Sequence, residues 1–191
     1  MAKRNNHTVY WSGYTNMVGE FHLAATATGL CFVGSPNKGI QELGDWARQR
    51  FPEVELIENA ETLKPYKQEL DEYFQGKQQT FNLPADVEGT TFQQEIWEAL
   101  KDIPYGETYT YSQIAAMIGR PRAVRAVGTA IGRNPLLISV PCHRVVGKNG
   151  SLAGYRGGLE MKEQLLELEQ AKKTNTQKSK PPVRTGGLFC G

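Results

Sequence analysis

The chain has 191 residues, a formal net charge of +2, 39% hydrophobic residues and 22% charged residues, an ordinary composition for one large or two small globular domains. No apolar run reaches the roughly 20 residues that a membrane-spanning helix needs, and no apolar segment follows the basic N-terminus as it would in a signal peptide. Three scattered cysteines, Cys31, Cys142 and Cys190, exclude a disulfide framework and lack the spacing of metal ligands, so we expect a cytoplasmic protein that uses no metal or other cofactor.

Charge is distributed unevenly along the chain. Residues 108–158 contain seven basic residues and no acidic ones, whereas residues 1–107 and 159–170 together contain ten Lys or Arg and all twenty Asp and Glu. A long segment with one sign of charge favours contact with a polyanion such as nucleic acid. The seven basic residues are Arg120, Arg122, Arg125, Arg133, Arg144, Lys148 and Arg156.

The first 86 residues predict a small α+β domain. Residues 8–34 are rich in β-branched and aromatic residues with Gly-containing turns and predict short strands, and residues 55–58 predict a further one. Apolar residues at helical spacing predict helices over residues 38–51 and 61–76, the second ended by Gly76. This domain contains no ligand set, nucleophile pair or phosphate loop, and we interpret it as a scaffold.

Residues 87–171 predict a second, mostly helical domain. Thr91 and Gln94 have the spacing of a capping box at the start of a helix, and Thr110 and Gln113 repeat it. Gly119 ends the second helix, and two short amphipathic helices joined by such a turn predict a helix-turn-helix. The apolar face of the helix after this turn is formed by Val124, Val127, Gly128 and Ile131.

The helix after the Gly119 turn has three arginines that lie off its apolar face, Arg122, Arg125 and Arg133. Surface arginines on a helix pair are usually only solvated. A solvated face usually mixes both signs of charge, however, so the absence of acidic residues favours DNA binding.

The segment after this helix leads to an unusual cysteine. Residues 136–140 predict a short buried strand or extended run that delivers Pro141, Cys142, His143 and Arg144, and residues 145–146 continue as a strand. A glycine-rich loop at residues 154–158 precedes a final helix from residue 159 to about residue 171. The basic residues 172–191 predict a disordered tail. The predicted fold class is therefore α+β with two domains, residues 1–86 and 87–171.

A cysteine that follows an apolar run is usually a small buried hydrophobic residue. Cys142 differs because His143 follows it and arginines lie nearby, which favours the thiolate form that attacks carbon. Adjacent residues of a strand point apart, so a contact between this cysteine and histidine needs a turn or a bridging water. The dipeptide alone is a weak signal.

The full pattern is more specific. The segments 112–115, 125–128, 134–135, 141–146 and 154–158 closely resemble, in order and spacing, the O6-alkylguanine-DNA alkyltransferases, also called methylated-DNA–protein-cysteine methyltransferases. The resemblance covers about residues 88–170. It implies a DNA repair protein that moves an alkyl group from O6 of guanine, and from O4 of thymine, to its own cysteine in one irreversible turnover with base flipping. We expect a monomer that binds alkylated double-stranded DNA from the minor-groove side and has no membrane partner.

The resemblance also implies a role for each matching residue. Cys142 would accept the alkyl group, His143 would act as its water-mediated base, Glu169 would orient the histidine, and Asn134 would tie the turn before the cysteine. Tyr111 would crowd the phosphate beside the lesion and donate to the guanine, and Arg125 would fill the gap left by the flipped base. The further DNA-binding positions are Val124, Gly128, Thr129, Arg122 and Arg133, and the pocket wall is Tyr155, Arg156, Gly157 and Val145.

The sequence departs from the family pattern at two places, and two rival functions are also compatible with it. Arg156 stands where human-type members carry serine, and Leu136 and Leu137 replace a proline-rich segment, so the guanine contacts and the tolerated alkyl size are not fixed. One rival is a lesion-binding or regulatory helix-turn-helix protein with an idle cysteine. The other is a thiol hydrolase that uses Cys142 and His143. Covalent change at Cys142 excludes the first, and a single stoichiometric event excludes the second.

Overall fold

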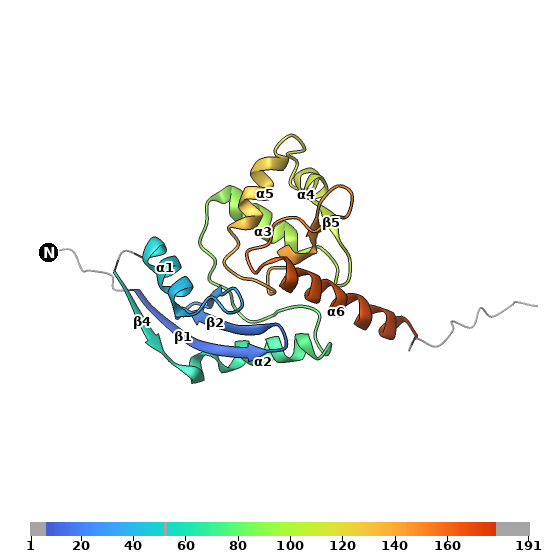
Figure 1. Ribbon diagram of the computed structural model, residues 1–191. Coiled ribbons are helices and arrows are strands. Elements are labelled where there is room, and N and C mark those ends of the chain that lie inside the picture. Colours follow the sequence, from blue (N-terminus) through green and yellow to red (C-terminus); the bar gives the residue numbers. More distant parts are fainter. Residues whose placement is uncertain (1–6, 52, 179–191) are drawn as a thin grey trace, which may run out of the picture.

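The computed structural model of the protein describes residues 7–51 and 53–178. Its first domain contains a four-stranded sheet in the order β3-β2-β1-β4. Strands β1 (His7–Asn16), β2 (Gly19–Ala25) and β3 (Leu30–Val33) pair antiparallel, and β4 (Val54–Glu58) pairs parallel to β1 at the edge (Figure 1). The strands predicted within residues 8–34 and at residues 55–58 are confirmed.

Two helices cover the two faces of this sheet. Helix α1 (Ile40–Arg50) packs on one face, and α2 (Ala60–Phe74) packs on the other (Figure 1). Successive side chains of β1 point to opposite faces of the sheet, so each helix has its own hydrophobic cluster. Val9 and Trp11 belong to the cluster under α1, and Tyr10 and Tyr14 belong to the cluster under α2. Both predicted helices are confirmed to within two residues at each end.

The second domain begins with α3 (Thr91–Lys101), which is followed by β5 (Tyr109–Thr110), α4 (Tyr111–Met117) and α5 (Val124–Gly132). The capping box of α3 is formed by Thr90 and Gln93, one residue earlier than predicted. The sequence has two adjacent threonines, and the observed register is the one that buries Ile96, Trp97 and Leu100. The predicted capping box of α4, made by Thr110 and Gln113, is confirmed.

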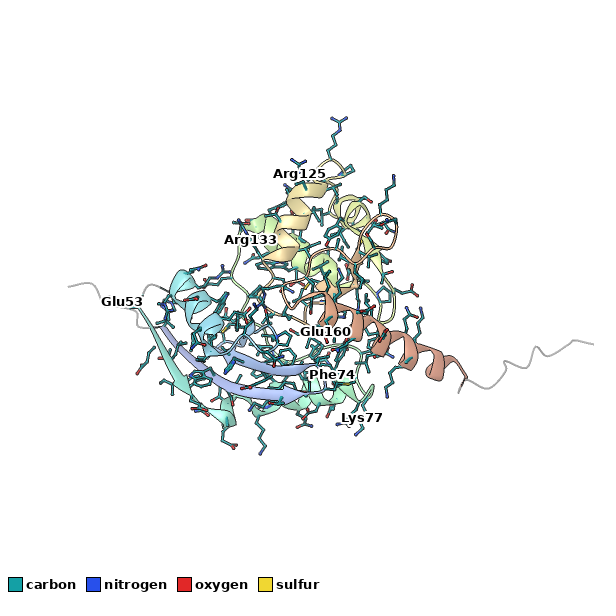
Figure 2. All side chains as sticks on the ribbon, in the orientation of Figure 1. Glu53, Phe74, Lys77, Arg125, Arg133 and Glu160 are labelled. Carbon is teal, nitrogen blue, oxygen red and sulfur yellow. The ribbon has the colours of Figure 1, made fainter. Side chains whose placement is uncertain are left out.

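Helices α4 and α5 pack on each other and on α3 as the predicted helix-turn-helix. The indole Nε1 of Trp97 on α3 donates to the Ala130 carbonyl oxygen of α5 at 3.0 Å, which fixes α5 to the body of the domain. Arg125 and Arg133 are exposed at opposite ends of α5. Arg125 lies at the end of the molecule away from the sheet, and Arg133 lies nearer the first domain (Figure 2).

The strand expected at residues 136–140 does not form. These residues make turns, in which only Leu136 forms a single bridge to Val33, and Ile138 has a φ of 71°. The reason is the side chain of Asn134, which bonds to the Leu136 N–H and to the carbonyl oxygens of Leu136 and Val140. These groups therefore do not need a neighbouring strand.

The chain then enters a short 3₁₀ turn, η1 (Cys142–Arg144), and the strand β6 (Val145–Val146), which pairs parallel to β5. The last helix, α6 (Leu159–Lys178), runs seven residues beyond the predicted end. The prediction of disorder from Lys172 is wrong up to Lys178, because Lys172 packs against Gly76 and Lys173 pairs with Glu107. Residues 179–191 lie outside the described residues. No helix in the described ranges has both the length and the apolar character to cross a membrane.

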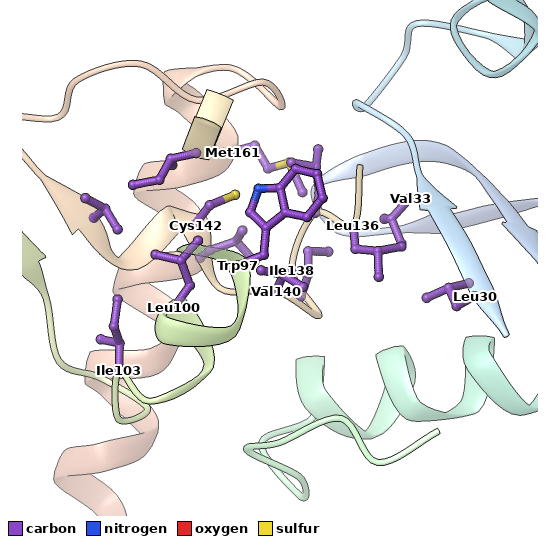
Figure 3. Packing of buried hydrophobic residues seen from close by; sticks show 14 of the residues in the cluster. Leu30, Val33, Trp97, Leu100, Ile103, Leu136, Ile138, Val140, Cys142 and Met161 are labelled. Atoms are coloured by element: carbon purple, nitrogen blue, oxygen red, sulfur yellow. The ribbon is translucent and has the colours of Figure 1, made fainter. Parts of the chain in front are cut away.

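One hydrophobic cluster spans both domains. Figure 3 shows Leu136 facing Leu30 and Val33 of the sheet, while Trp97 and Cys142 lie on the side of the second domain. The backbone N–H of Val33 donates to the Pro135 carbonyl oxygen at 2.9 Å, so the edge of the sheet is joined to the segment before the cysteine. The first domain thus supports the region in which the cysteine lies.

Candidate active site

Cys142 lies at the start of η1, where only 3% of its surface is exposed. The side-chain amide of Asn134 donates to its Sγ atom at 3.1 Å. The same amide group donates to the carbonyl oxygens of Leu136 and Val140, each at 3.1 Å. Asn134 therefore fixes both the thiol and the backbone turn that leads to it, at the position that the sequence assigned to it.

His143 and Glu169 are both fully buried, and His143 Nε2 lies 2.9 Å from Glu169 Oε1. The sequence analysis required a turn or a bridging water for a contact between Cys142 and His143. The structure has a turn at these residues, but no direct hydrogen bond joins the two side chains in the described part of the chain. Among the described residues, the other ring nitrogen, Nδ1, has no hydrogen-bond partner. A neutral histidine that donates from Nε2 to a carboxylate carries its lone pair on Nδ1, where it can accept a proton.

Several donors hold the carboxylate of Glu169. Tyr73 Oη donates to Oε1 at 2.7 Å, the Gly106 N–H donates to Oε2 at 2.9 Å, and the guanidinium of Arg144 donates to both oxygens at 2.9 to 3.2 Å. Burial alone would raise the pKa of Glu169, but the hydrogen bonds and charges of His143 and Arg144 lower it to about 2. The carboxylate is therefore ionised at neutral pH.

Arg144 is not part of a DNA-facing surface, contrary to what its place in the basic segment suggested. It is 5% exposed, and besides Glu169 it donates from Nη1 to the Ile103 carbonyl oxygen at 2.6 Å. A buried guanidinium needs an anionic partner, and Glu169 is that partner.

The expectation that nearby arginines favour the thiolate holds for Arg156, whose charge lowers the pKa of the Cys142 thiol, but burial outweighs this effect in the resting protein. Burial raises the pKa of the Cys142 thiol, against the Asn134 hydrogen bond and the charges of Arg156 and Lys162, which lower it. Burial also lowers the pKa of His143, although Glu169 opposes this shift. At neutral pH the two residues are thus a neutral thiol and a neutral imidazole, that is, an acid beside an available base.

The loop after β6 forms a wall next to the cysteine. Tyr155 lies edge-on to the ring of His143, with 6.4 Å between the ring centroids. A Cβ atom at Gly157 would come within 2.4 Å of Met161 Sδ and 2.7 Å of the Tyr155 ring, so only glycine fits there. Val145 is fully buried beside them.

Sequence reasoning missed Lys162, which is fully buried on α6. Its Nζ atom donates to the carbonyl oxygens of Val145 at 2.6 Å and Ala153 at 2.8 Å, and burial lowers its pKa to about 8. The signal was present, because Lys162 and Glu169 are seven residues apart and share the buried side of the helix with Met161 and Leu165.

The Arg156 side chain does not line the pocket wall as predicted. Its guanidinium turns to the first domain, where it donates to the Val33 carbonyl oxygen at 2.5 Å and pairs with Glu42 at 2.9 Å. It also donates to the carbonyl oxygens of Asn134 at 3.1 Å and Pro135 at 3.0 Å. We interpret Arg156 as a contact between the domains that supports the pocket loop from behind.

The predicted DNA-binding residues gather on the outer side of the helix-turn-helix. Arg122, Arg125, Thr129 and Arg133 are exposed, and they line a shallow groove between α5 and the start of α3. Val124 and Gly128 are partly buried, and Tyr111 packs its ring 3.6 Å from the point where a Cβ atom of Gly128 would lie. The Tyr111 hydroxyl donates to the Ala153 carbonyl oxygen at 2.9 Å, next to Lys162.

The described residues contain no group of three or more His, Cys, Asp or Glu side chains placed to hold a metal ion. Within the same residues, Cys31 and Cys142 are free thiols, and burial raises the pKa of Cys31 to about 12. Of these two, Cys142 is the one followed by a histidine that is hydrogen-bonded to a carboxylate, so it is the candidate nucleophile of the described chain.

Comparison with known proteins gives the same assignment for both domains. The DNA binding domain of 6-O-methylguanine DNA methyltransferase matches residues 91–171, and the ribonuclease-like domain of the same family matches residues 9–87. The chain is 55% identical over 166 residues to the inducible methylated-DNA–protein-cysteine methyltransferase of Bacillus subtilis strain 168, across 87% of this chain and 93% of that protein. Its identity to the corresponding Methanosarcina acetivorans protein is 43% over 163 residues, across 84% and 98%.

Solved structures agree. The crystal structure of Mycobacterium tuberculosis O6-methylguanine methyltransferase matches with a TM-score of 0.74 and 37% identity, across 86% of this chain and 94% of that chain. A structure of the Mycobacterium tuberculosis protein in complex with DNA matches with a TM-score of 0.74 and 36% identity over the same shares. The chain belongs to the 6-O-methylguanine DNA methyltransferase family.

Proposed function

We propose that this protein repairs DNA by transferring an alkyl group, methyl above all, from the O6 atom of guanine to the Sγ atom of Cys142. The observation that carries this proposal is the buried arrangement of Asn134, Cys142, His143 and Glu169 beside a helix-turn-helix with exposed arginines. The relatives named as methylated-DNA–protein-cysteine methyltransferases support it.

The chemistry follows from the two neutral partners. The Cys142 thiol gives its proton to His143 Nδ1 through a water molecule, and the resulting thiolate attacks the alkyl carbon. The sulfur–carbon bond forms as the carbon–O6 bond breaks, and the electron pair of the broken bond stays on the guanine. The Tyr111 hydroxyl donates a hydrogen bond to the guanine, which takes up one proton from water and is restored, while the imidazolium of His143 releases the former thiol proton to the solvent. Glu169 stays ionised throughout and stabilises the imidazolium.

The product is a thioether, from which neither water nor a second thiol readily displaces the alkyl group. Each molecule therefore reacts once. The same attack applies to O4-alkylthymine, in which the alkyl carbon is bonded to an oxygen of the same kind.

The target carbon lies inside a stacked base pair, so the nucleotide has to leave the duplex, at a cost of a few kcal/mol. Arg125 projects from α5 and fills the vacated place from the minor-groove side, while Arg122 and Arg133 bind phosphates. A monomer is sufficient, because nucleophile, base and recognition helix all come from one chain. The free thiols of Cys31 and Cys142 fit a protein that works in the reducing cytoplasm.

The test is the mass of the intact protein before and after incubation with a duplex that contains one O6-methylguanine. We expect a gain of one methyl group in place of one hydrogen per protein molecule, located in the tryptic peptide of residues 134–144. A label on Cys31 or Cys190 would overturn the assignment. An unchanged mass in a protein that binds the duplex would support the pure binding function, and continued turnover of an ester would support the hydrolase.

A further inference from the structure

Tyr73 belongs to α2 of the first domain, yet its side chain reaches into the site of the second domain. It is fully buried, and its hydroxyl lies 2.7 Å from Glu169 Oε1 and 3.5 Å from His143 Nε2. These residues are 96 and 70 positions away in the sequence. The first domain, which the sequence suggested to be a scaffold only, therefore contacts the group that orients the base.

The position of this hydroxyl is set by packing. The Tyr73 ring is surrounded by the rings of Phe74, Phe81 and Tyr105, with centroid distances of 5.4 to 5.9 Å. Burial raises the pKa of Tyr73 well above its ordinary value, and the charge and hydrogen bond of Glu169 raise it further. The phenol is therefore always protonated, and its proton points to the carboxylate.

The other donors to Glu169 bind both of its oxygens. The Gly106 N–H donates to Oε2, on the side away from His143, Arg144 Nε donates to both oxygens, and Arg144 Nη2 donates to Oε1 at 2.9 Å. Tyr73 donates to Oε1 alone, which is the oxygen that faces His143 Nε2. Its hydrogen bond thus holds Oε1 against the imidazole and keeps the ring proton on Nε2, which leaves the lone pair on Nδ1.

We propose that Tyr73 is a positioning residue for the transfer reaction, and that the first domain completes the active site by placing it. The role rests on the proposed function of Cys142, and it acts through Glu169 and His143 rather than on the DNA. The separation of the domains would remove the Tyr73 donor and leave the base less well oriented.

The experiment uses the full chain with Tyr73→Phe, which keeps the ring contacts and removes only the hydroxyl. At saturating duplex with one O6-methylguanine, the single-turnover rate constant should fall about tenfold, the effect of losing one hydrogen bond to a charged group. The Kd for the duplex should stay at the parent's value, because the exposed Arg122, Arg125 and Arg133 are unchanged. In proton NMR spectra, the His143 Nε2–H signal should be sharp and exchange-protected in the parent and broadened in the variant.

Two matched variants separate positioning from general stability. Tyr14→Phe removes another tyrosine–carboxylate hydrogen bond of the first domain, the 2.8 Å contact with Asp71 on α2, which involves neither Glu169 nor His143. Tyr105→Phe removes a buried hydroxyl that has no hydrogen-bond partner in the described chain and lies beside Tyr73. Both should keep the parent's rate constant and His143 signal, whatever they do to the melting temperature.

A Tyr73→Phe protein with the parent's rate constant and an unchanged His143 signal would overturn the inference. So would an equal loss of rate in Tyr14→Phe, because the effect would then come from the stability of the domain. Failure of the proposed function looks different, since the parent itself would then gain no methyl group on Cys142.

Discussion

Replacing Arg156 by alanine should lower the free energy of unfolding of the protein, because this side chain joins the pocket loop to the first domain. The substitution removes donors from three main-chain carbonyl groups, those of Val33, Asn134 and Pro135. It also removes the ion pair with Glu42 at 2.9 Å and the contact of the guanidinium with the Phe32 ring at 5.1 Å.

The size of the effect follows from the exposure of the groups. The Arg156 and Glu42 side chains are 22% and 24% exposed, so water can enter and solvate the abandoned carbonyl groups. Each lost hydrogen bond then costs about 1 kcal/mol, near the middle of the usual net range. The partly screened ion pair adds about 0.5 kcal/mol. We therefore expect the free energy of unfolding to fall by about 3 to 4 kcal/mol.

Urea unfolding at neutral pH measures this difference. Arg156→Lys serves as the matched control, because lysine keeps the charge but cannot donate to three carbonyl groups and a carboxylate in one plane, so most of the loss should remain. A double-mutant cycle with Glu42→Gln should give a coupling of about 0.5 kcal/mol between the two side chains. A loss below about 1 kcal/mol for Arg156→Ala would refute the reasoning, and so would full rescue by lysine.

Three further variants test the site. Cys142→Ser should abolish transfer, seen as an unchanged intact mass, and should leave the Kd for DNA nearly unchanged, because a serine hydroxyl is a far poorer nucleophile towards carbon. Arg125→Ala should slow single-turnover repair strongly even at saturating duplex, whereas a residue that only contacts phosphate would lose affinity that lower salt restores. Glu169 has its pKa lowered from 4.5 to about 2, so it contributes stability above pH 4.5 that is lost as the pH falls towards 2. Between pH 4.5 and pH 2, the free energy of unfolding should therefore fall by about 3 kcal/mol more in the parent than in Glu169→Gln. Urea unfolding at the two pH values measures this, and an equal fall in both proteins would contradict the pKa shift.

Much of the fold could be predicted because its signals are local. The capping residues, the glycine turns and the apolar spacing of α2, α4 and α5 depend on neighbours within a few residues, and these elements form where they were expected. The segment at residues 136–140 could not be predicted, because its apolar run looks like a strand and only the side chain of Asn134 shows why it turns.

The site divides in the same way. The resemblance named Cys142, His143, Glu169 and Asn134, and the structure brings these four together. The roles of Tyr73 and Arg144 could not be predicted, because they come from contacts between residues far apart in the sequence. Tyr73 of the first domain bonds to Glu169 of the second, and Arg144 bonds to the Ile103 carbonyl oxygen. No local pattern marks a tyrosine on an ordinary amphipathic helix as a partner of a carboxylate 96 residues later.

The cluster shared by both domains has a consequence for the newborn chain. The apolar edge formed by Leu30 and Val33 is covered in the finished protein by Leu136, which is made about 50 residues after the first domain is complete. At a synthesis rate of about 5 to 20 residues per second, that interval lasts on the order of several seconds. During it, the Leu30 end of β3 is bonded to Pro84 and Asp86, but the Val33 end lacks its partner Pro135. An unpaired β-edge is the kind of surface that chaperones bind and that drives aggregation. Productive folding on the ribosome therefore depends on how soon the segment that carries the nucleophile arrives to cover this edge.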